Sequence, residues 1–342
     1  RWPVISRAGQ LSSLLTTTPL HGFRNLIING NFDIWQRAPS QSVGGYGSAD
    51  RWLFYFGTGS GVVSRQAFDL GQSDVPGNPR FFCRHVVSTL SAAGIGTALG
   101  QRIEDVRTLA GRTATLTFYA RAENEQMIAA RAVQDFGTGG SPSAVVETPV
   151  ASFNVGPNWQ KCTATVNIPS IAGKTLGDAN DHLRIDIGRP AADTVGGYLD
   201  VARVSLVEGD ATAEVDPFAP RHISQEMAMC RRYLYRIEAV NQPYMIFGGC
   251  GYAESATYAL IPVAFPALMR ADPGVSISAA GDFVLRRPGN VIVPITSVAI
   301  NVSNRYGALL GVNVASGLTV GEPLFLHANN NTGASLLFSA EL

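Results

Sequence analysis

Aromatic residues suited to sugar binding gather between residues 52 and 56 of the 342-residue chain. A sugar-binding groove needs flat rings that pack against the apolar face of a pyranose, with hydrogen-bonding groups around them. Side chains alternate between the two faces of a strand, so we expect Trp52, Phe54 and Phe56 on one face and Tyr55 on the other. One face must fill the core, and its polar hydroxyl makes Tyr55 the better candidate for a solvated groove.

The segment 116–122 shows the same alternation, with Phe118 facing away from Tyr119 and Arg121. Tyr119 and Arg121 have polar ends and are therefore the other candidates for a solvated groove. The alternative for every ring is that it packs in the core, and Trp52 is the most ambiguous of the set. The candidate carbohydrate-binding residues are Trp52, Tyr55, Tyr119, Arg121 and Phe136.

Oxygen-bearing side chains suited to a hard cation occur at Asn31 and Asp33, near the first strand, and at Asp200, in the last strand of the same region. Calcium takes several oxygen ligands from carboxylates and backbone carbonyls on a rigid loop. A jelly roll brings its two ends together, so these three residues are candidate ligands of a structural Ca²⁺. The alternative is that Asn31 and Asp33 cap a turn through hydrogen bonds to the backbone. No cofactor is required.

Residues arranged for catalysis are not apparent. Glycoside hydrolysis needs two carboxyl groups about 5–10 Å apart. Glu104 and Asp105 are neighbours whose side chains would point to opposite faces of a strand. The chain has no GxSxG-type elbow, and the glycine-rich segment 137–140 lacks the Lys-Ser/Thr pair of a phosphate-binding loop. We therefore expect a protein that is not an enzyme.

The composition limits the partners. Lys+Arg and Asp+Glu are both 26, so the formal net charge is zero. Binding to nucleic acid or to an anionic membrane surface needs an excess of positive charge, so neither partner is expected. The longest apolar stretch, 258–269, is interrupted by Pro262 and Pro266, which predicts no transmembrane helix. The four cysteines are scattered and lack the spacing of a zinc site.

Short runs of alternating or β-branched residues recur between turn residues after Asn25. They cover 52–56, 81–88, 113–122, 127–134, 162–168, 182–187 and 198–207. Many short strands at close spacing, without helical periods between them, predict an all-β fold with a jelly-roll β-sandwich.

The best domain boundary lies at 214–223, where Pro217 and Pro220 interrupt the pattern. This predicts an N-terminal arm or linker over 1–24, a jelly roll over 25–213, the linker 214–223 and a second, β-sandwich-like domain over 224–342. The last domain should open with a short helix after Ser224. It is poor in charge and has no lysine, which makes it a candidate for burying surface against copies of itself.

A longer motif supports the jelly roll. Residues 25–37 read NLIINGNFDIWQR and are followed by ADRW at 49–52. This opening resembles the start of jelly-roll modules in phage tail-fibre and receptor-binding proteins. Its layout is also similar to that of the carbohydrate-binding modules attached to glycan-degrading enzymes. The further segments that match in order are 100–105, 109–112, 116–122, 159–161 and 198–209.

The C-terminal segments 230–233, 265–270 and 338–342 look like fibre tips of the same phage group. The resemblance covers nearly everything after residue 24. It implies a virion appendage, a homotrimeric assembly, a structural ion near the ends of the jelly roll and a glycan-facing role.

These observations lead to one expectation and two alternatives. We expect a structural fibre or spike subunit, located in the virion, that binds host cell-surface polysaccharide for attachment. Its 1–24 arm would contact other virion proteins, and the charge-poor region 224–342 would form a homotrimer. The alternatives are a polysaccharide depolymerase and a purely structural decoration or collar protein.

Overall fold

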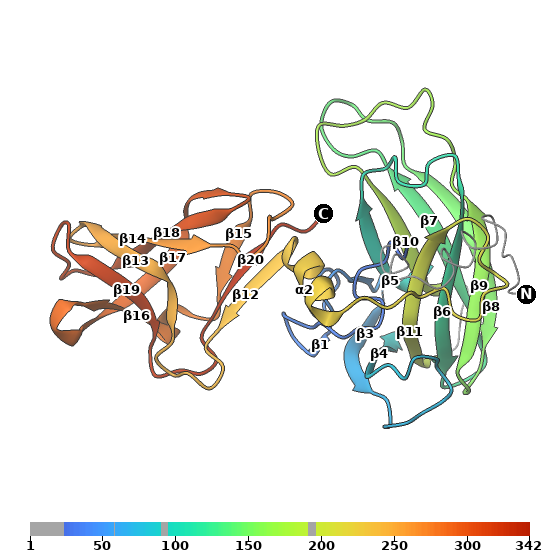
Figure 1. Cartoon of the computed structure of the whole chain (residues 1–342), viewed down its shortest axis with the longest axis horizontal. Coiled ribbons are helices and arrows are strands. Elements are labelled where there is room, and N and C mark those ends of the chain that lie inside the picture. The colour runs from blue at the N-terminus through green and yellow to red at the C-terminus, as the bar shows by residue number, and fades with distance from the viewer. Residues whose placement is uncertain (1–23, 58, 90–94, 191–195) are drawn as a thin grey trace, which may run out of the picture. The chain divides into compact units, whose positions relative to one another are not determined.

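The computed structural model describes residues 24–57, 59–89, 95–190 and 196–342, shown in Figure 1. The predicted arm 1–24 therefore lies outside the described residues except for Arg24. The chain divides into an N-terminal unit that runs to Glu226 and also includes Leu342, and a C-terminal unit that spans Met227–Glu341. This division falls just after the predicted linker 214–223.

The N-terminal unit is a sandwich of two antiparallel sheets. One sheet has six strands in the order β1-β3-β4-β11-β6-β9, and the other has five in the order β2-β5-β10-β7-β8. This arrangement confirms the all-β class and the two-sheet sandwich. The strands are β1 (Ser40–Gln41), β2 (Leu53–Tyr55), β3 (Ser60–Ala67), β4 (Phe81–Thr89), β5 (Ile95–Glu104), β6 (Thr113–Ala122), β7 (Gln126–Asp135), β8 (Val146–Val155), β9 (Gln160–Asn167), β10 (His182–Pro190) and β11 (Gly197–Glu208).

Alternating side chains build the core between the two sheets. Leu183, Ile185 and Ile187 of β10 are buried among its apolar residues, whereas Arg184 and Asp186 alternate with them on the other face of the strand. The largest buried side chains in this core are Trp52, Phe32, Phe54, Phe118, Ile27 and Leu99.

The loop 25–37, which carries the recognised motif, is fixed by buried polar contacts. The Nδ2 of Asn29 donates to the carbonyl oxygens of Ile34 (2.8 Å) and Asp50 (3.0 Å), and its Oδ1 accepts from the Ile34 amide. Asn29 has a φ of 57°, a left-handed conformation that asparagine tolerates. The indole of Trp52 donates to the Asn29 carbonyl. The motif is therefore part of the framework of the sandwich.

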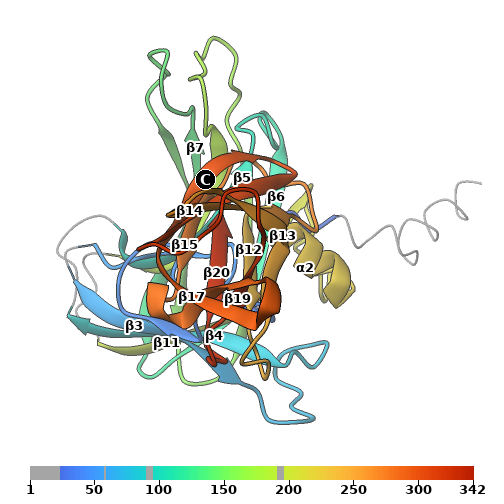
Figure 2. The ribbon, with the colours of Figure 1, turned by 90° about the vertical axis from the view of Figure 1, so that its left-hand side faces the viewer.

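The helix α2 (Ile223–Arg231) carries the chain from the first unit into the second and matches the helix expected after Ser224. The C-terminal unit then forms a closed six-stranded barrel in the order β13-β14-β18-β17-β16-β19, and β12, β20 and β15 form a three-stranded sheet (Figure 2). The elements are β12 (Leu234–Glu238), β13 (Ile246–Ser255), β14 (Tyr258–Ala264), β15 (Gly274–Ile277), β16 (Phe283–Arg287), β17 (Val291–Asn304), β18 (Gly307–Val314), β19 (Pro323–Ala328) and β20 (Ser335–Ser339), with short 3₁₀ turns at η2 (Ala280–Asp282) and η3 (Pro288–Asn290).

The C-terminal unit is all-β as expected, but its main sheet closes on itself. Closure leaves no unpaired strand edge in the barrel, which a pair of open sheets would have. Phe247, Phe283 and Leu326 lie in its core, where the rings of Phe247 and Phe283 are 5.0 Å apart. In the described part of the chain, no helix has the length and apolar character needed to cross a membrane.

Candidate functional site

An open groove of about 500 Å³ lies on the outward face of the five-stranded sheet. Tyr55 on β2, Ala98 and Arg102 on β5, and Arg131 on β7 contribute to its lining. The remaining lining residues are Gly44, Gly45, Leu53, Phe54, Phe56 and Gly57. Its volume is in the range typical of small-molecule sites, about 300–1,000 Å³.

Ala98, which lines the groove, begins a row of small residues across the sheet. Ala98 on β5 pairs with Gly188 on β10, and Gly188 in turn pairs with Ala129 on β7. A Cβ added at Gly188 would lie 2.2 Å from the carbonyl oxygen of Thr97, so the strands pack too closely there for any side chain. Three neighbouring strands therefore present almost no side chain to the solvent in this row.

One buried carboxylate organises the basic residues around the groove. Asp186 on β10 has a fully buried side chain whose Oδ2 accepts from Nε of Arg131 and whose Oδ1 accepts from Nε of Arg184, both at 2.9 Å. Arg131 also donates to Glu147 on the edge strand β8 at 2.8 Å. A Cβ at Gly100 would lie 2.5 Å from Oδ1 of Asp186, so this glycine makes room for the carboxylate.

Tyr55 forms one wall of the groove. Its side chain is half-buried, and Cζ of Arg184 lies 5.4 Å from the centre of its ring. Burial raises the pKa of the Tyr55 hydroxyl, and the charges of Arg184 and Arg102 oppose that rise in part. The hydroxyl therefore remains protonated at neutral pH, and because the hydroxyl oxygen itself is buried, the Tyr55 ring rather than its hydroxyl is what a ligand in the groove would meet.

The outward face of the six-stranded sheet repeats the same charge pattern. Asp200 on β11 is fully buried between its cross-strand partners Arg84 on β4 and Arg121 on β6. Its carboxylate accepts from both nitrogens of an Arg84 fork, at 2.7 and 2.8 Å, and from Nε of Arg121 at 2.9 Å. Tyr198 lies beside this cluster, with Cζ of Arg84 4.0 Å from its ring centre.

Aromatic side chains cover this second face. Trp159 packs against Phe68 and Phe82 with ring centres 5.2 and 5.3 Å apart, and the guanidinium of Arg121 lies 4.9 Å from the indole. Val75, from the connection between β3 and β4, is buried in the same cluster. The rings on this face are thus engaged in packing with one another.

The structure places the predicted sugar-binding residues in different environments. Tyr55 lines the groove, as its alternation suggested, and Arg121 lies in the cluster around Asp200. Trp52 and Phe136 have exposures of 0% and 1%, so both belong to the interior and neither ring can contact a ligand in this fold. Tyr119 is 7% exposed and packs with the aromatic cluster of the six-stranded sheet.

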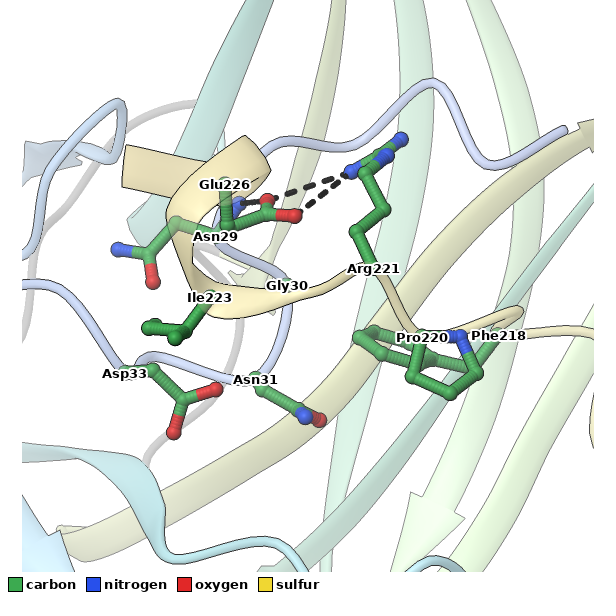
Figure 3. A pocket seen from close by; sticks show the side chains of 9 residues that line it. All are labelled: Asn29, Gly30, Asn31, Asp33, Phe218, Pro220, Arg221, Ile223 and Glu226. Carbon is green, nitrogen blue, oxygen red and sulfur yellow. Dashed lines mark hydrogen bonds and ion pairs between the residues drawn. The ribbon is translucent and has the colours of Figure 1, made fainter. Parts of the chain in front are cut away.

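The three predicted calcium ligands lie in two different places. Asn31 and Asp33 line a small cavity of about 60 Å³ beside Glu226 and Arg221 (Figure 3). Asp200 does not line this cavity, and both of its oxygens accept hydrogen bonds from arginines, so the structure does not bring the three predicted ligands together.

Within the cavity of Figure 3, Glu226 is also engaged. Its carboxylate accepts from the Arg221 guanidinium at 3.1 and 3.2 Å and from the Asn29 amide. Burial raises the pKa of Asp33, and the hydrogen bond from Asn31 opposes the rise. No group of three or more His, Cys, Asp or Glu side chains suited to a metal ion is found among the described residues.

Comparison with known proteins gives structural similarity only. No protein-family model matches the sequence, and no curated protein matches it. Among solved structures, a CBM4 carbohydrate-binding module is 16% identical, covers 53% of this chain and 98% of its own, and has a TM-score of 0.33. The CBM22-2 xylan-binding domain of Paenibacillus barcinonensis Xyn10C is 12% identical, covers 54% of this chain and 99% of its own, and has a TM-score of 0.34.

A phage protein appears in the same comparison. The enzymatically active domain of bacteriophage CBA120 tailspike protein 4 is 14% identical over 56% of this chain, with a TM-score of 0.33, and only 22% of that protein is matched. At these TM-scores the similarities do not identify a ligand, so the function must be argued from the groove itself.

Sequence reasoning missed the basic residues that line the groove, Arg102 and Arg131, and the pair Arg184 and Asp186 beside them. The alternation Arg184-Ile185-Asp186 could have placed the first and last of these on the outward face of one strand. The sequence carries no sign of the pairing of β10 with β5 and β7, which brings Arg102 and Arg131 beside them.

Proposed function

We propose that the N-terminal unit binds a polysaccharide in the groove over β2, β5 and β7, and that the protein is a non-catalytic subunit of a viral fibre or spike. The observation that carries the first part is the groove itself. It has an aromatic wall, guanidinium donors at its side and, at Ala98, the start of a row of small residues. A pyranose ring needs an apolar surface for its C–H face and donors for its hydroxyl groups.

The carboxylates near the groove favour binding over catalysis. Asp186 is held by two arginines, and Glu147 is bound by Arg131. A glycosidase needs one carboxyl group that is free to give up a proton and a second that is free to attack or to activate water. Charge pairing leaves neither of these two groups in such a state, which supports a binding role.

The second part of the proposal rests on the sequence resemblance to phage fibre proteins over most of the chain after residue 24. In this proposal the protein is located in the virion, the arm 1–24 attaches it to other virion proteins, and the region 224–342 trimerises. Three identical grooves on one particle would raise the effective concentration of sites, so weak single-site binding would suffice for attachment. Sedimentation of the purified protein at micromolar concentration tests the trimer, and a monomer would contradict it.

Binding is tested by comparing two matched tyrosines. Tyr55 and Tyr198 are both half-buried and lie under an arginine, but only Tyr55 lines the groove. Tyr55→Ala should weaken binding to glycans identified on an array by about tenfold or more, and Tyr198→Ala should leave it unchanged. Equal effects of both substitutions would show that the groove is not the site.

Two further outcomes separate the alternatives. Release of new reducing ends from host surface polysaccharide would favour a depolymerase. An array without hits, combined with tight contacts to neighbouring proteins in assembled particles, would favour a purely structural decoration or collar protein.

A further inference from the structure

Several arginines lie on the outward face of the five-stranded sheet, and no acidic residue is among the described residues that line the groove there. Arg102 on β5 and Arg184 on β10 are direct cross-strand partners, so two positive charges stand side by side on one face of the sheet. Like charges directly opposite each other destabilise a pair of strands. Such an arrangement suggests a role other than holding the sheet together.

The lining of the groove carries one sign of charge. Among the described residues that line it, the charged ones are Arg102 and Arg131. The carboxylates that pair with Arg131 are Asp186, which is fully buried beneath it, and Glu147, whose side chain is 53% exposed on the edge strand. A ligand in the groove would therefore meet guanidinium groups and no carboxylate among the lining residues.

Hydrogen-bond donors remain on both arginines. A guanidinium has five N–H donors in a planar fork. The Arg131 side chain uses Nε and one terminal nitrogen on Asp186 and Glu147, and the Arg102 side chain donates to the carbonyl oxygen of Leu342. Nε of Arg102 is buried, so the donors left for a ligand are terminal N–H groups of the two guanidiniums, and such groups form charge-assisted hydrogen bonds with a carboxylate.

Resting on the proposed function, we propose that the groove selects an acidic polysaccharide, in which a ring carboxylate is bound by Arg102 with Arg131 while the sugar ring packs beside Tyr55. Sugar carboxylates are ionised at neutral pH, so they bring the negative charge that the lining lacks. A neutral sugar of the same shape would bring no negative charge to these guanidinium groups, and Arg131 would keep only its pairs with Asp186 and Glu147. The charge-assisted hydrogen bonds should make the acidic sugar about tenfold to a hundredfold tighter.

The test uses sugars that differ only in charge. Oligogalacturonate and oligosialate, each beside its carboxyl-reduced form, are titrated into the full chain by calorimetry. The two acidic sugars distinguish a hexuronate from a sialate as the source of the carboxylate. We expect at least one acidic sugar to bind, its reduced form to bind about tenfold or more weakly, and added salt to narrow the difference.

Arg102→Gln should abolish the preference for the acidic form. The matched control is Arg112→Gln, because Arg112 is an exposed arginine of the same unit that pairs with Glu208 and does not line the groove. Thermal melts of both variants establish that they are folded. A preference that survives Arg102→Gln, or that Arg112→Gln also removes, would overturn the inference.

Failure of the inference and failure of the proposed function give different results. If the reduced sugars bind as tightly as the acidic ones and Tyr55→Ala weakens both, the groove binds sugars but does not select acids. If none of the four sugars binds and an array also shows no hits, the proposed function fails and the inference with it.

Discussion

The two outward faces of the N-terminal sandwich carry the same charge cluster in opposite settings. On each face a fully buried aspartate binds two arginines. Asp200 on the six-stranded sheet binds one from each neighbouring strand, whereas Asp186 on the five-stranded sheet binds Arg131 from the neighbouring β7 and Arg184 from its own strand. Around Asp186 the next row holds Ala98 and Gly188, and the face is hollow. Around Asp200 the neighbouring positions hold large rings that close the face.

The comparison of the two faces shows that a buried aspartate bound by arginines can stabilise the sandwich without forming a binding site. A carboxylate bound by two arginines satisfies buried charge on both faces, so the cluster alone does not mark a site. The two faces differ in the residues beside the cluster. Next to Asp186 the strands β5 and β10 carry Ala98 and Gly188, which have little or no side chain, and a groove lies beside this cluster. The connection between β3 and β4, with Phe68 and Val75, supplies the cover that the other face lacks.

The largest expected effect comes from neutralising the two aspartates. Asp200→Asn should lower the free energy of unfolding of the N-terminal unit by about 3 kcal/mol, because an amide nitrogen would face the guanidinium groups of Arg84 and Arg121. Asp186→Asn should cost a similar amount and should also weaken sugar binding, because it releases Arg131 and Arg184. Urea unfolding followed by tryptophan fluorescence reports on this unit alone, since all four tryptophans precede Glu226.

The two substitutions also test the assignment of the faces. If Asp200→Asn weakens sugar binding as much as Asp186→Asn does, the closed face takes part in binding. The presence of a groove on one face and of packed rings on the other would then not explain which face binds sugar.

The next largest effect is a pH dependence of stability that comes from His85, in the core between the two sheets. Burial, and then the charge of Arg189, lower the pKa of His85 on β4 to about 3, and neither ring nitrogen has a hydrogen-bond partner among the described residues. The unfolded chain takes up this proton below about pH 6.5, whereas the folded chain does not, so stability is complete above pH 6.5 and falls as the pH drops towards 3. The loss should be about 2 kcal/mol at pH 5.

His85 points into the core from β4, whereas the adjacent Arg84 points outward. Because both sheets pack on this core, protonation of His85 should unfold the two sheets together. Sugar binding and tryptophan fluorescence should therefore be lost with the same pH midpoint. His85→Phe should flatten the pH dependence of urea unfolding between pH 5 and 7. An unchanged slope in that variant would assign the acid sensitivity to another group.

A smaller effect is expected from opening the closed face. Trp159→Ala removes the ring that packs between Phe68, Phe82 and Arg121. Because Trp159 is partly exposed, we expect a loss of about 1–2 kcal/mol, below the 3–5 kcal/mol typical of a fully buried aromatic. Urea unfolding measures the loss, and sugar affinity should stay unchanged. A gain of sugar binding on the opened face would show that the aromatic cover alone prevents binding there.

Alternation along single strands was predictable, and pairing between strands was not. The opposite orientations of Trp52 and Tyr55 follow from period-two alternation, as do the all-β class and the separation of Phe118 from Tyr119. The burial of Phe136 and the partners of Asp200 depend on which strands become neighbours. That choice joins residues such as Arg84 and Asp200, which are 116 positions apart.

The groove was the feature least predictable from the sequence, because it depends on where small residues come together once the strands have paired. Gly100 and Gly188 can be read as turn or bulge residues, and only the register of β5 against β10 shows that Gly100 makes room for Asp186 and that Gly188 pairs with Ala98 of the groove lining. Closure of the C-terminal barrel has the same origin, since it depends on the pairing of β13 with β19 at the two ends of the sheet.

Removal of divalent cations should have the smallest effect, and it tests whether the two aspartate clusters are equivalent. Calcium prefers six to eight oxygen ligands. Asp200 is bound by Arg84 and Arg121. Among the described residues lining the cavity of Figure 3, the carboxylates are those of Glu226, which is bound by Arg221, and Asp33. We therefore expect the same melting temperature with and without a chelator in differential scanning calorimetry. A clear drop on chelation would show that a divalent cation stabilises the fold. Loss of that drop in Asp200→Asn would place the ion on the closed face and end its likeness to the cluster around Asp186, whereas loss in Asp33→Asn would place the ion in the cavity of Figure 3.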